Sequence, residues 1–358
     1  MTGMDRATVD LYETRGGEWV AHHPPVQSSQ ARTFARGLPT GVLRIDLGCG
    51  AGRYTSDLGN PVIGFDAARV MLDGCAHADP GALLVQGDLE ALPFGTKTLH
   101  GGWAHMSYLH VPSVRLPGAL ADLHRTLVVG APLEIQVLAG DYEGRALPAD
   151  RIGGRFFAAW TPERLRDVLM GAGFDVGEPE IDGDFVRAPA VRARTLPDVV
   201  GPGMRLLVVG LNPSIYSADI GVGYGRPGNR FWPAALDCGL VTRDRDPFHA
   251  LRVHGVGMTD LVKRATSNAS TVTSAEYRTG MARVQRLVRW LAPGAVCFVG
   301  LTGWREAVDR RAKAGPQQEQ IGGRPVYVMP STSGANAHER LESLRAHLGA
   351  ARSLAAES

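Results

Sequence analysis

The sequence predicts an α/β protein with two domains. Short apolar runs, typical of buried strands, alternate with helix-like stretches, and this alternation starts again beyond the middle of the chain. Glycine accounts for 45 of the 358 residues, which suits tight turns between strands and helices. A chain of this length is also long for a single hydrophobic core, so two domains of ordinary size are expected.

The first half alternates strands and helices in the manner of a parallel sheet covered on both faces. Strands are expected over Val42–Leu47, Val62–Phe65, Ala82–Val85, Leu99–Trp103 and Pro132–Leu138. Helices are expected over Ala67–Ala78, Val114–Val128 and Thr161–Ala172, the last beginning with a threonine cap and a proline in the first turn. A hairpin-like pair follows, with strands Phe174–Glu180 and Phe185–Ala188 and a turn at Asp182-Gly183-Asp184.

Residues 189–203 change character and are expected to link the domains, because they hold three prolines and two glycines without a clear period. Beyond them, strands are expected over Met204–Val209, Gly294–Val299 and Pro325–Met329, and helices over Gln285–Leu291 and Glu339–Leu348. The predicted organisation is a first domain over 1–188, a linker over 189–203, a second domain over 204–349 and a frayed tail over 350–358.

The composition is that of a soluble globular protein, with 44% hydrophobic and 21% charged residues. A net charge of +2 does not by itself demand a nucleic-acid partner. The four cysteines are far apart and show no metal-ligand spacing, so we expect no metal site and a reducing, cytoplasmic location. The first residues lack the pattern of a signal peptide, and no apolar run is long enough to span a membrane.

A glycine-rich turn follows the first expected strand, with the sequence Asp-Leu-Gly-Cys-Gly-Ala-Gly over residues 46–52. Glycines there let the chain turn sharply and let a cofactor approach the backbone. Asp66 ends the next strand, where an acid can bind both ribose hydroxyls of a nucleoside. Asp88 follows the third strand, where it can meet an adenine amino group. We therefore expect a cofactor to be bound by Asp46, Gly48, Gly50, Gly52, Asp66, Asp88 and Leu89.

NAD would satisfy the same logic, but three details favour S-adenosylmethionine. They are the acid before the glycines, which suits a cationic amino-acid group, the acid at Asp88, and the segment Leu92-Pro93-Phe94 that leads to the fourth strand. With these features, residues 5–188 resemble the class I S-adenosylmethionine-dependent methyltransferases. The resemblance implies a Rossmann-like sheet and S-adenosylmethionine as cofactor, but it does not identify the methyl acceptor.

The acceptor side carries few signals. His105 and His110 follow the fourth strand and are candidates for a base or for lining residues. Neither the Asn/Asp-Pro-Pro-Tyr motif of amino-methylating DNA enzymes nor the Pro-Cys nucleophile of cytosine-C5 enzymes stands here. A DNA base methylated by either mechanism is therefore not expected as the acceptor.

The second half holds three segments that look like a base-excision site. They are Gly-Leu-Asn-Pro-Ser over 210–214, Gly-Arg-Pro-Gly-Asn-Arg-Phe-Trp over 225–232, and Met-Pro-Ser-Thr-Ser-Gly-Ala-Asn over 329–336. An amide at Asn212, fixed by the turn and by Pro213, can orient a water without fully deprotonating it. Tyr224 is placed to stack on an extruded pyrimidine. Small hydroxyl residues and amides in the last segment suit phosphate contacts.

These segments, with Gly257–Val262, Arg264 and Thr266, resemble the mismatch-specific uracil/thymine-DNA glycosylases of the uracil-DNA glycosylase superfamily over residues 203–349. The resemblance implies a uracil-DNA-glycosylase-like α/β/α sandwich in which Asn212 positions the water, needing no cofactor, with mismatched or single-stranded DNA as partner. It implies contacts to the base or to DNA by Ser217, Tyr224, Asn229, Ser331, Ser333, Gly334, Ala335 and Asn336.

Three positions depart from the family pattern. Ser331 replaces a histidine of the ordinary uracil-removing branch, so stabilisation of the leaving base by an imidazole is missing. Ala335 stands at the wedge position, where one methyl group fills little of the space that an extruded base leaves. Asp260 stands where an amide or a lysine is common, and a carboxylate there opposes phosphate binding unless it faces the base pocket. We therefore expect slow excision with relaxed dependence on duplex DNA.

Three hypotheses follow from the two halves. In the first, the second half hydrolyses the N-glycosidic bond of uracil or a mispaired pyrimidine, beside a methyltransferase of unknown acceptor. In the second, the methyltransferase acts on a small molecule and the second half only binds DNA. In the third, the first half senses its cofactor or serves assembly without turnover.

Overall fold

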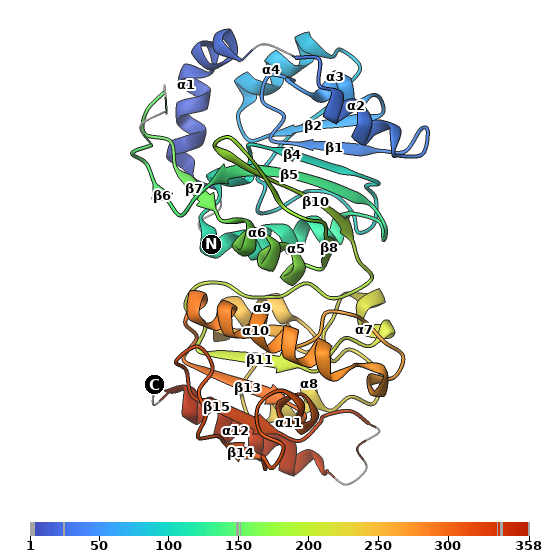
Figure 1. The fold of residues 1–358 in the computed structure, drawn as a ribbon, viewed down its shortest axis with the longest axis vertical. Helices are drawn as coiled ribbons and strands as arrows, with labels where there is room; N and C mark the ends of the chain where they lie inside the picture. The colour runs from blue at the N-terminus through green and yellow to red at the C-terminus, as the bar shows by residue number, and fades with distance from the viewer. Residues whose placement is uncertain are drawn as a thin grey trace. The chain divides into compact units, whose positions relative to one another are not determined.

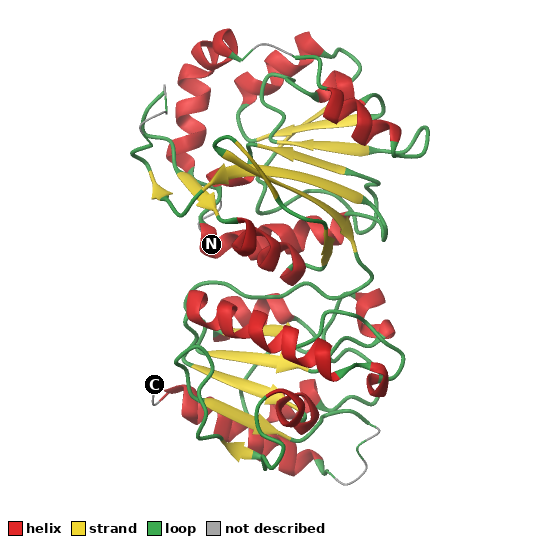
Figure 2. Ribbon diagram, in the orientation of Figure 1, coloured by secondary structure: helices red, strands yellow, loops and turns green. Residues whose placement is uncertain are grey.

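The computed structural model describes residues 4–23, 26–147, 150, 152–334, 336 and 339–356. The chain forms two compact units, of which the N-terminal unit ends at Ala193 and the C-terminal unit begins at Arg194. Both units are α/β, each with one sheet and helices packed around it (Figures 1 and 2). Across the described ranges, no helix is long and apolar enough to cross a membrane.

The sheet of the N-terminal unit has a central parallel part with strand order β3-β2-β1-β4-β5. This is the order in doubly wound nucleotide-binding folds, where ligands bind beside the strand at which the order reverses, here β1. β10 continues the sheet antiparallel to β5, and β8 and β9 pair with β10. The strands are β1 (Arg44–Leu47), β2 (Val62–Asp66), β3 (Leu83–Gln86), β4 (Gly102–His105), β5 (Pro132–Ala139), β6 (Glu143–Gly144), β7 (Phe157–Trp160), β8 (Phe174–Val176), β9 (Glu180–Asp182) and β10 (Phe185–Arg192).

The helices of this unit begin at residues that satisfy their free backbone amides. The Asp5 side chain accepts a hydrogen bond from the Thr8 amide at the start of α1, and Ser28 caps α2 in the same way. Pro117 occupies the first turn of α5, where a missing amide proton costs nothing. The helices are α1 (Arg6–His22), α2 (Ser29–Arg36), α3 (Thr55–Leu58), α4 (Arg69–Ala78), α5 (Leu116–Thr126) and α6 (Pro162–Gly171), with 3₁₀ turns at Tyr108–His110 and Ser113–Arg115.

The C-terminal unit is built on a smaller sheet of strand order β12-β11-β13-β15-β14, in which all pairs except β14–β15 are parallel. Its strands are β11 (Leu206–Gly210), β12 (Val256–Asp260), β13 (Ala295–Val299), β14 (Gly315–Pro316) and β15 (Val326–Met329). Its helices are α7 (Ile215–Ile220), α8 (Phe231–Asp237), α9 (Pro247–His254), α10 (Ser274–Leu291), α11 (Leu301–Ala307) and α12 (Leu341–Ala356), with a 3₁₀ turn at Ala269–Thr271.

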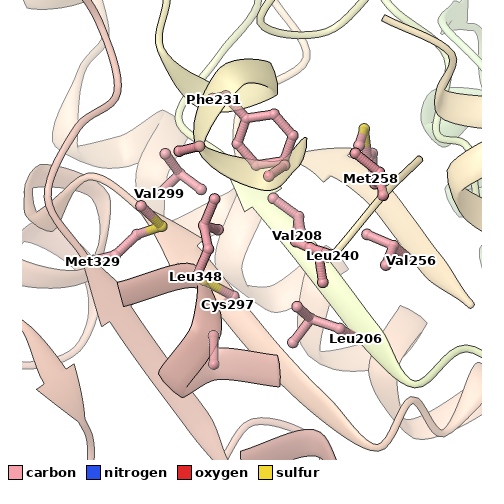
Figure 3. Close-up of a cluster of buried hydrophobic side chains, with 14 of the residues drawn as sticks. Leu206, Val208, Phe231, Leu240, Val256, Met258, Cys297, Val299, Met329 and Leu348 are labelled. Carbon is pink, nitrogen blue, oxygen red and sulfur yellow. The ribbon is translucent and has the colours of Figure 1, made fainter. Parts of the chain in front are cut away.

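A buried apolar cluster joins this sheet to helices α8 and α12. Val208, Cys297 and Met329 of three adjacent strands meet Phe231 and Leu348 from the two helices (Figure 3). α12 runs through Ala356, and Ala351 is fully buried in the same cluster. The expected frayed tail over 350–358 is therefore wrong for its described residues, because the helix keeps an apolar face beyond Gly349.

The segment expected as a linker is largely part of the two folded units. β10 extends to Arg192, and Pro189 is accommodated because its carbonyl accepts from the Gly177 amide without needing an amide proton of its own. In the C-terminal unit, Asp198 is buried and Val199 exchanges two backbone hydrogen bonds with Met258 of β12. The proline-rich composition concealed these side-chain and strand contacts.

Candidate functional site

The carboxyl ends of β1, β2, β3 and β4 surround a cavity of about 410 Å³ in the N-terminal unit. Five of the seven predicted cofactor residues line it, and α1 and the segment after β4 form further walls. The predicted residues on the cavity are Gly48, Gly50, Asp66, Asp88 and Leu89. The volume lies in the range of small-molecule sites.

Asp66 ties the glycine-rich turn to the start of α4. One carboxylate oxygen accepts from the Gly50 amide at 2.9 Å, and the other accepts from the Ala68 amide at 2.9 Å. Burial raises the pKa of Asp66, although these backbone donors oppose the shift. Asp88 is fixed similarly, since it accepts from the amides of Met4 and Glu90. Each oxygen has a second lone pair with which it can accept from a ligand hydroxyl or amino group.

The glycines of the turn have separate roles. Gly50 has φ of 53°, and a side-chain carbon there would meet no atom within 4 Å, so its backbone faces open space in the cavity. At Gly48 a side-chain carbon would lie 2.3 Å from the Ser107 Cβ, which shows how closely the segment after β4 packs on the turn. Gly52 instead faces Cys75 and Ala78 of α4 and does not line the cavity.

Asp46 also does not line the cavity, which corrects its expected contact with a cationic ligand group. It is 2% exposed and accepts a hydrogen bond from the Thr55 hydroxyl at 2.7 Å. Burial raises its pKa to about 7. The side chain alternates with its neighbours along β1, and this places the carboxyl against α3 rather than towards the ligand space.

The remaining cavity wall is aromatic and comes largely from α1. Tyr12, Trp19 and His23 of this helical segment line the cavity. Trp19 and His23 stack with centroids 3.5 Å apart. Behind Tyr12, the Arg155 guanidinium donates to its hydroxyl at 2.6 Å and forms a buried ion pair with Asp150. The sequence interpretation missed these residues, although their spacing along a helix would have placed them on one face.

In the C-terminal unit, the Asn212 amide is held by the segment that follows β12. Its Nδ2 donates to the Thr266 hydroxyl at 2.8 Å and to the Arg264 carbonyl at 3.0 Å. Both donor positions of the side chain are thereby used, and no described residue donates to its Oδ1. Asn212 is part-exposed at the carboxyl end of β11, so this oxygen can accept from a water.

Arg230 fixes the loop that follows β15. Its backbone amide donates to the Thr332 carbonyl, and its guanidinium donates to the carbonyls of Ser333, Asn336 and Glu339. Asn336 in turn donates to the Ser331 carbonyl at 3.0 Å. Ser331, Ser333, Gly334 and Asn336 are therefore one organised loop, while Ala335 lies outside the described residues. Arg230 therefore supports the conformation of this loop.

Tyr224 and Asp260 meet above Gly210. A side-chain carbon on Gly210 would lie 2.4 Å from an Asp260 carboxylate oxygen and 3.0 Å from the Tyr224 hydroxyl, so only glycine fits there. The Tyr224 ring stacks on Phe231 at 4.2 Å. One face of the ring is thus covered by the protein, and stacking on a base would use the other.

Two predicted DNA-contacting residues support local structure. Ser217 is buried in the first turn of α7, where its hydroxyl accepts from the Ser214 hydroxyl at 3.1 Å. Asn229 accepts from the Phe231 amide at 2.9 Å and so shapes the start of α8. Both residues lie near the other predicted site residues in the sequence, but their side chains form hydrogen bonds with neighbouring residues of the chain.

Asp260 supplies a pH-dependent prediction. Burial, with a contribution from Asp198, raises its pKa to about 6 against the opposing effect of Lys263 and Arg283. The unfolded carboxyl titrates near 4. The contribution of Asp260 to the stability of the C-terminal unit is therefore fully present below about pH 4 and is lost as the pH rises through about 6.

Asp260→Asn is expected to stabilise the C-terminal unit at neutral pH by on the order of 2 kcal/mol and to leave it nearly unchanged at pH 4. Calorimetry of both proteins between pH 4 and 8 tests this; parallel Tm curves would contradict it.

The N-terminal unit thus has the fold and cavity of a nucleotide-cofactor enzyme, and the C-terminal unit has a polar site at the carboxyl edge of a parallel sheet. Residues 45–130 match a family model described as a methyltransferase domain, and residues 197–353 match the uracil DNA glycosylase superfamily. The chain therefore contains one domain of each kind. Across the described ranges, no group of three or more histidine, cysteine or acidic residues is arranged to hold a metal.

Three similar solved structures align with about half of the chain. An S-adenosylmethionine-dependent methyltransferase from Methanosarcina mazei is 14% identical, with 47% of this chain and 98% of that chain covered and a TM-score of 0.41. A possible histamine N-methyltransferase from Thermotoga maritima is 18% identical, with 52% and 99% covered and a TM-score of 0.40. DhpI, in complex with S-adenosylhomocysteine, is 18% identical, with 54% and 98% covered and a TM-score of 0.45.

Proposed function

We propose that the C-terminal unit is a DNA glycosylase of the mismatch-specific uracil/thymine type. The observation that carries this proposal is the held amide of Asn212, whose nitrogen is bound by Thr266 and Arg264 while its oxygen accepts no described hydrogen bond. A water donating to that oxygen attacks the sugar C1′ of an extruded nucleotide. The N-glycosidic bond breaks, and its electron pair leaves with uracil or a mispaired pyrimidine.

The surrounding geometry supports the same reaction. Asn212 follows β11, Asp260 ends β12 and Ser331 follows β15, so three parallel strands direct their carboxyl ends to one edge of the sheet. Arg230 holds the loop after β15 in one arrangement, as a segment that contacts DNA requires. Neither Asn212 nor Ser331 is a strong acid or base. The enzyme therefore relies on the acidity of the departing base, and excision is slow.

We further propose that the N-terminal cavity binds S-adenosylmethionine for methyl transfer. Asp66 would accept from the ribose hydroxyls, Asp88 and Leu89 would contact adenine, and the open backbone at Gly50 would lie against the cofactor. These residues fit the group because the two carboxylates are half-buried, fixed by backbone amides and part of the lining of the same cavity. When bound, the cofactor supplies an electrophilic methyl group.

Asp66→Ala is expected to weaken S-adenosylmethionine binding by about 100-fold, because it removes the ribose acceptor and frees the glycine turn. Isothermal titration of the full chain measures this. Asp73→Ala is the matched control, since Asp73 is an exposed carboxylate of the adjoining helix α4. Equal affinity of Asp66→Ala and wild type would place the cofactor elsewhere.

A further inference from the structure

Two buried polar side chains that line the cavity of the N-terminal unit have no hydrogen-bond partner among the described residues. His105 is 7% exposed and Ser107 is 5% exposed, and both line the cavity. Both ring nitrogens of His105 and the hydroxyl of Ser107 are unpaired there. Buried polar atoms are costly to leave unpaired, so a group that enters the cavity and bonds to them is favoured.

The second histidine of this segment behaves differently. His110 Nε2 is hydrogen-bonded to the Tyr12 hydroxyl at 3.0 Å, and its Nδ1 is hydrogen-bonded to the Phe156 carbonyl at 2.7 Å. Both of its nitrogens therefore hold α1 and the chain before β7 in place. Of the two histidines that the sequence nominated, His105 is the one with bonding capacity left for a ligand.

His105 and Ser107 lie beside the turn that is proposed to hold the methyl donor. His105 ends β4, the neighbour of β1 in the sheet, and Ser107 lies just beyond it and packs directly against Gly48. A molecule bonded to His105 or Ser107 is thus next to the glycine-rich turn. This position suits a methyl acceptor.

The walls of the cavity favour a flat, uncharged acceptor. His105 stacks on Trp103 at 3.9 Å, and Tyr54 meets its edge at 5.2 Å. The stacked rings of Trp19 and His23 form another wall. The three carboxylates on the cavity are Asp5, Asp66 and Asp88, and each accepts a hydrogen bond from a backbone amide of the chain. Planar aromatic molecules match such surfaces best.

The burial of His105 and its two unpaired ring nitrogens bear on the kind of nucleophile that it can bind. Burial lowers its pKa to about 3, with a smaller effect from Arg187, so the ring is neutral and offers one donor and one acceptor. A phenol holds its proton to a pKa of about 10 and must lose it to become a good nucleophile, which this imidazole is too weak a base to achieve. An uncharged aromatic nitrogen already has a lone pair for attack.

We propose that His105 and Ser107 bind the methyl acceptor, and that this acceptor is a small heteroaromatic or aromatic amine with an uncharged nitrogen nucleophile. The inference rests on the proposed methyl transfer. The nitrogen forms a bond to the methyl carbon while the methyl–sulfur bond breaks and its electron pair stays on sulfur. The nitrogen becomes positively charged and then releases its proton to water.

Titration of the full chain, saturated with S-adenosylhomocysteine, tests the binding step with matched probes. Aniline and benzimidazole are compared with toluene and indane, which are similar in shape but cannot hydrogen-bond to His105 or Ser107. The nitrogen probes are expected to bind at least tenfold more tightly. His105→Leu removes this preference, and His105→Gln, which keeps a donor and an acceptor, restores most of it. His77→Leu, at an exposed histidine of α4, is the matched control and leaves it unchanged.

Titration of the wild-type chain with S-adenosylmethionine beforehand separates a failure of this inference from a failure of the proposed function. If the chain does not bind S-adenosylmethionine, the proposed function of the N-terminal unit is wrong. With the cofactor bound, equal affinity for nitrogen and hydrocarbon probes, no binding of any probe, or an unchanged preference in His105→Leu would overturn the inference. A parallel assay follows labelled methyl transfer to aniline, to benzimidazole, to phenol and to a single-stranded oligonucleotide. Transfer to phenol as fast as to aniline would overturn the choice of a nitrogen nucleophile. Transfer to the oligonucleotide alone would overturn the assignment to a small molecule.

Discussion

Asp198→Ala is expected to destabilise the C-terminal unit by about 3–5 kcal/mol. Asp198 accepts from Lys263 at 2.8 Å and from Arg283 at 2.7 Å, and the Thr259 hydroxyl donates to it at 2.6 Å. Both charged side chains of the Asp198–Arg283 pair are almost completely buried. Removal of the carboxylate leaves two buried cations without their counter-charge, which costs far more than the pair itself contributes.

Calorimetry of the full chain at neutral pH measures this effect as a fall in the Tm of one transition. The matched control is Asp219→Ala, which breaks an ion pair with Arg194 that is exposed on both sides, and it should cost less than about 1 kcal/mol. A similarly small effect at Asp198 would show that Arg283 and Lys263 find other partners. The segment 194–203 would then be a dispensable linker, as its composition suggested.

Asn212→Ala is expected to lower the single-turnover rate of uracil excision by about 100-fold or more, because the attacking water loses its fixed acceptor. Thr266→Val, which removes the shortest of the hydrogen bonds that hold the amide, should give a smaller loss of about tenfold without altering DNA affinity. Rates are measured on a uracil:guanine duplex by cleavage of the abasic product in alkali.

The control for this series is Asn268→Ala. Asn268 is an exposed asparagine of the same unit that only caps a 3₁₀ turn, so its loss should leave the rate unchanged. Equal rates for Asn212→Ala and wild type would mean that another group places the water.

The alternation of apolar runs predicted both sheets because parallel strands buried on two faces have a recognisable composition. Edges of elements were less predictable. Leu99 reads as the start of a strand, yet β4 begins at Gly102, and Leu99 forms only an isolated bridge with Leu127. The sequence predicts that Pro189 interrupts regular structure, but it lies inside β10. Its carbonyl accepts a hydrogen bond from the Gly177 amide, and this contact needs no amide proton from Pro189.

The two sites also combine features that the sequence predicted with features that it did not. Residues at or just beyond strand ends, such as Asp66 and Asn212, could be placed from the sequence, because a parallel sheet brings strand ends to one edge. The direction in which a side chain points at a strand end could not be predicted from the sequence. Asp46 is an example, because it points away from the cavity. Contacts between distant segments were also hidden. The Arg230 guanidinium donates to carbonyls about a hundred residues further along the chain, and no local sequence pattern indicates such a contact.

The most direct test of the account is a single-turnover assay of the wild-type full chain on uracil-containing DNA, as a uracil:guanine duplex and as the single strand that carries the uracil. Asn212, the organised loop after β15 and the match to the uracil DNA glycosylase superfamily predict slow formation of abasic sites on both substrates. No abasic product on either substrate, although the DNA is bound, would contradict the account and leave the C-terminal unit as a DNA-binding module.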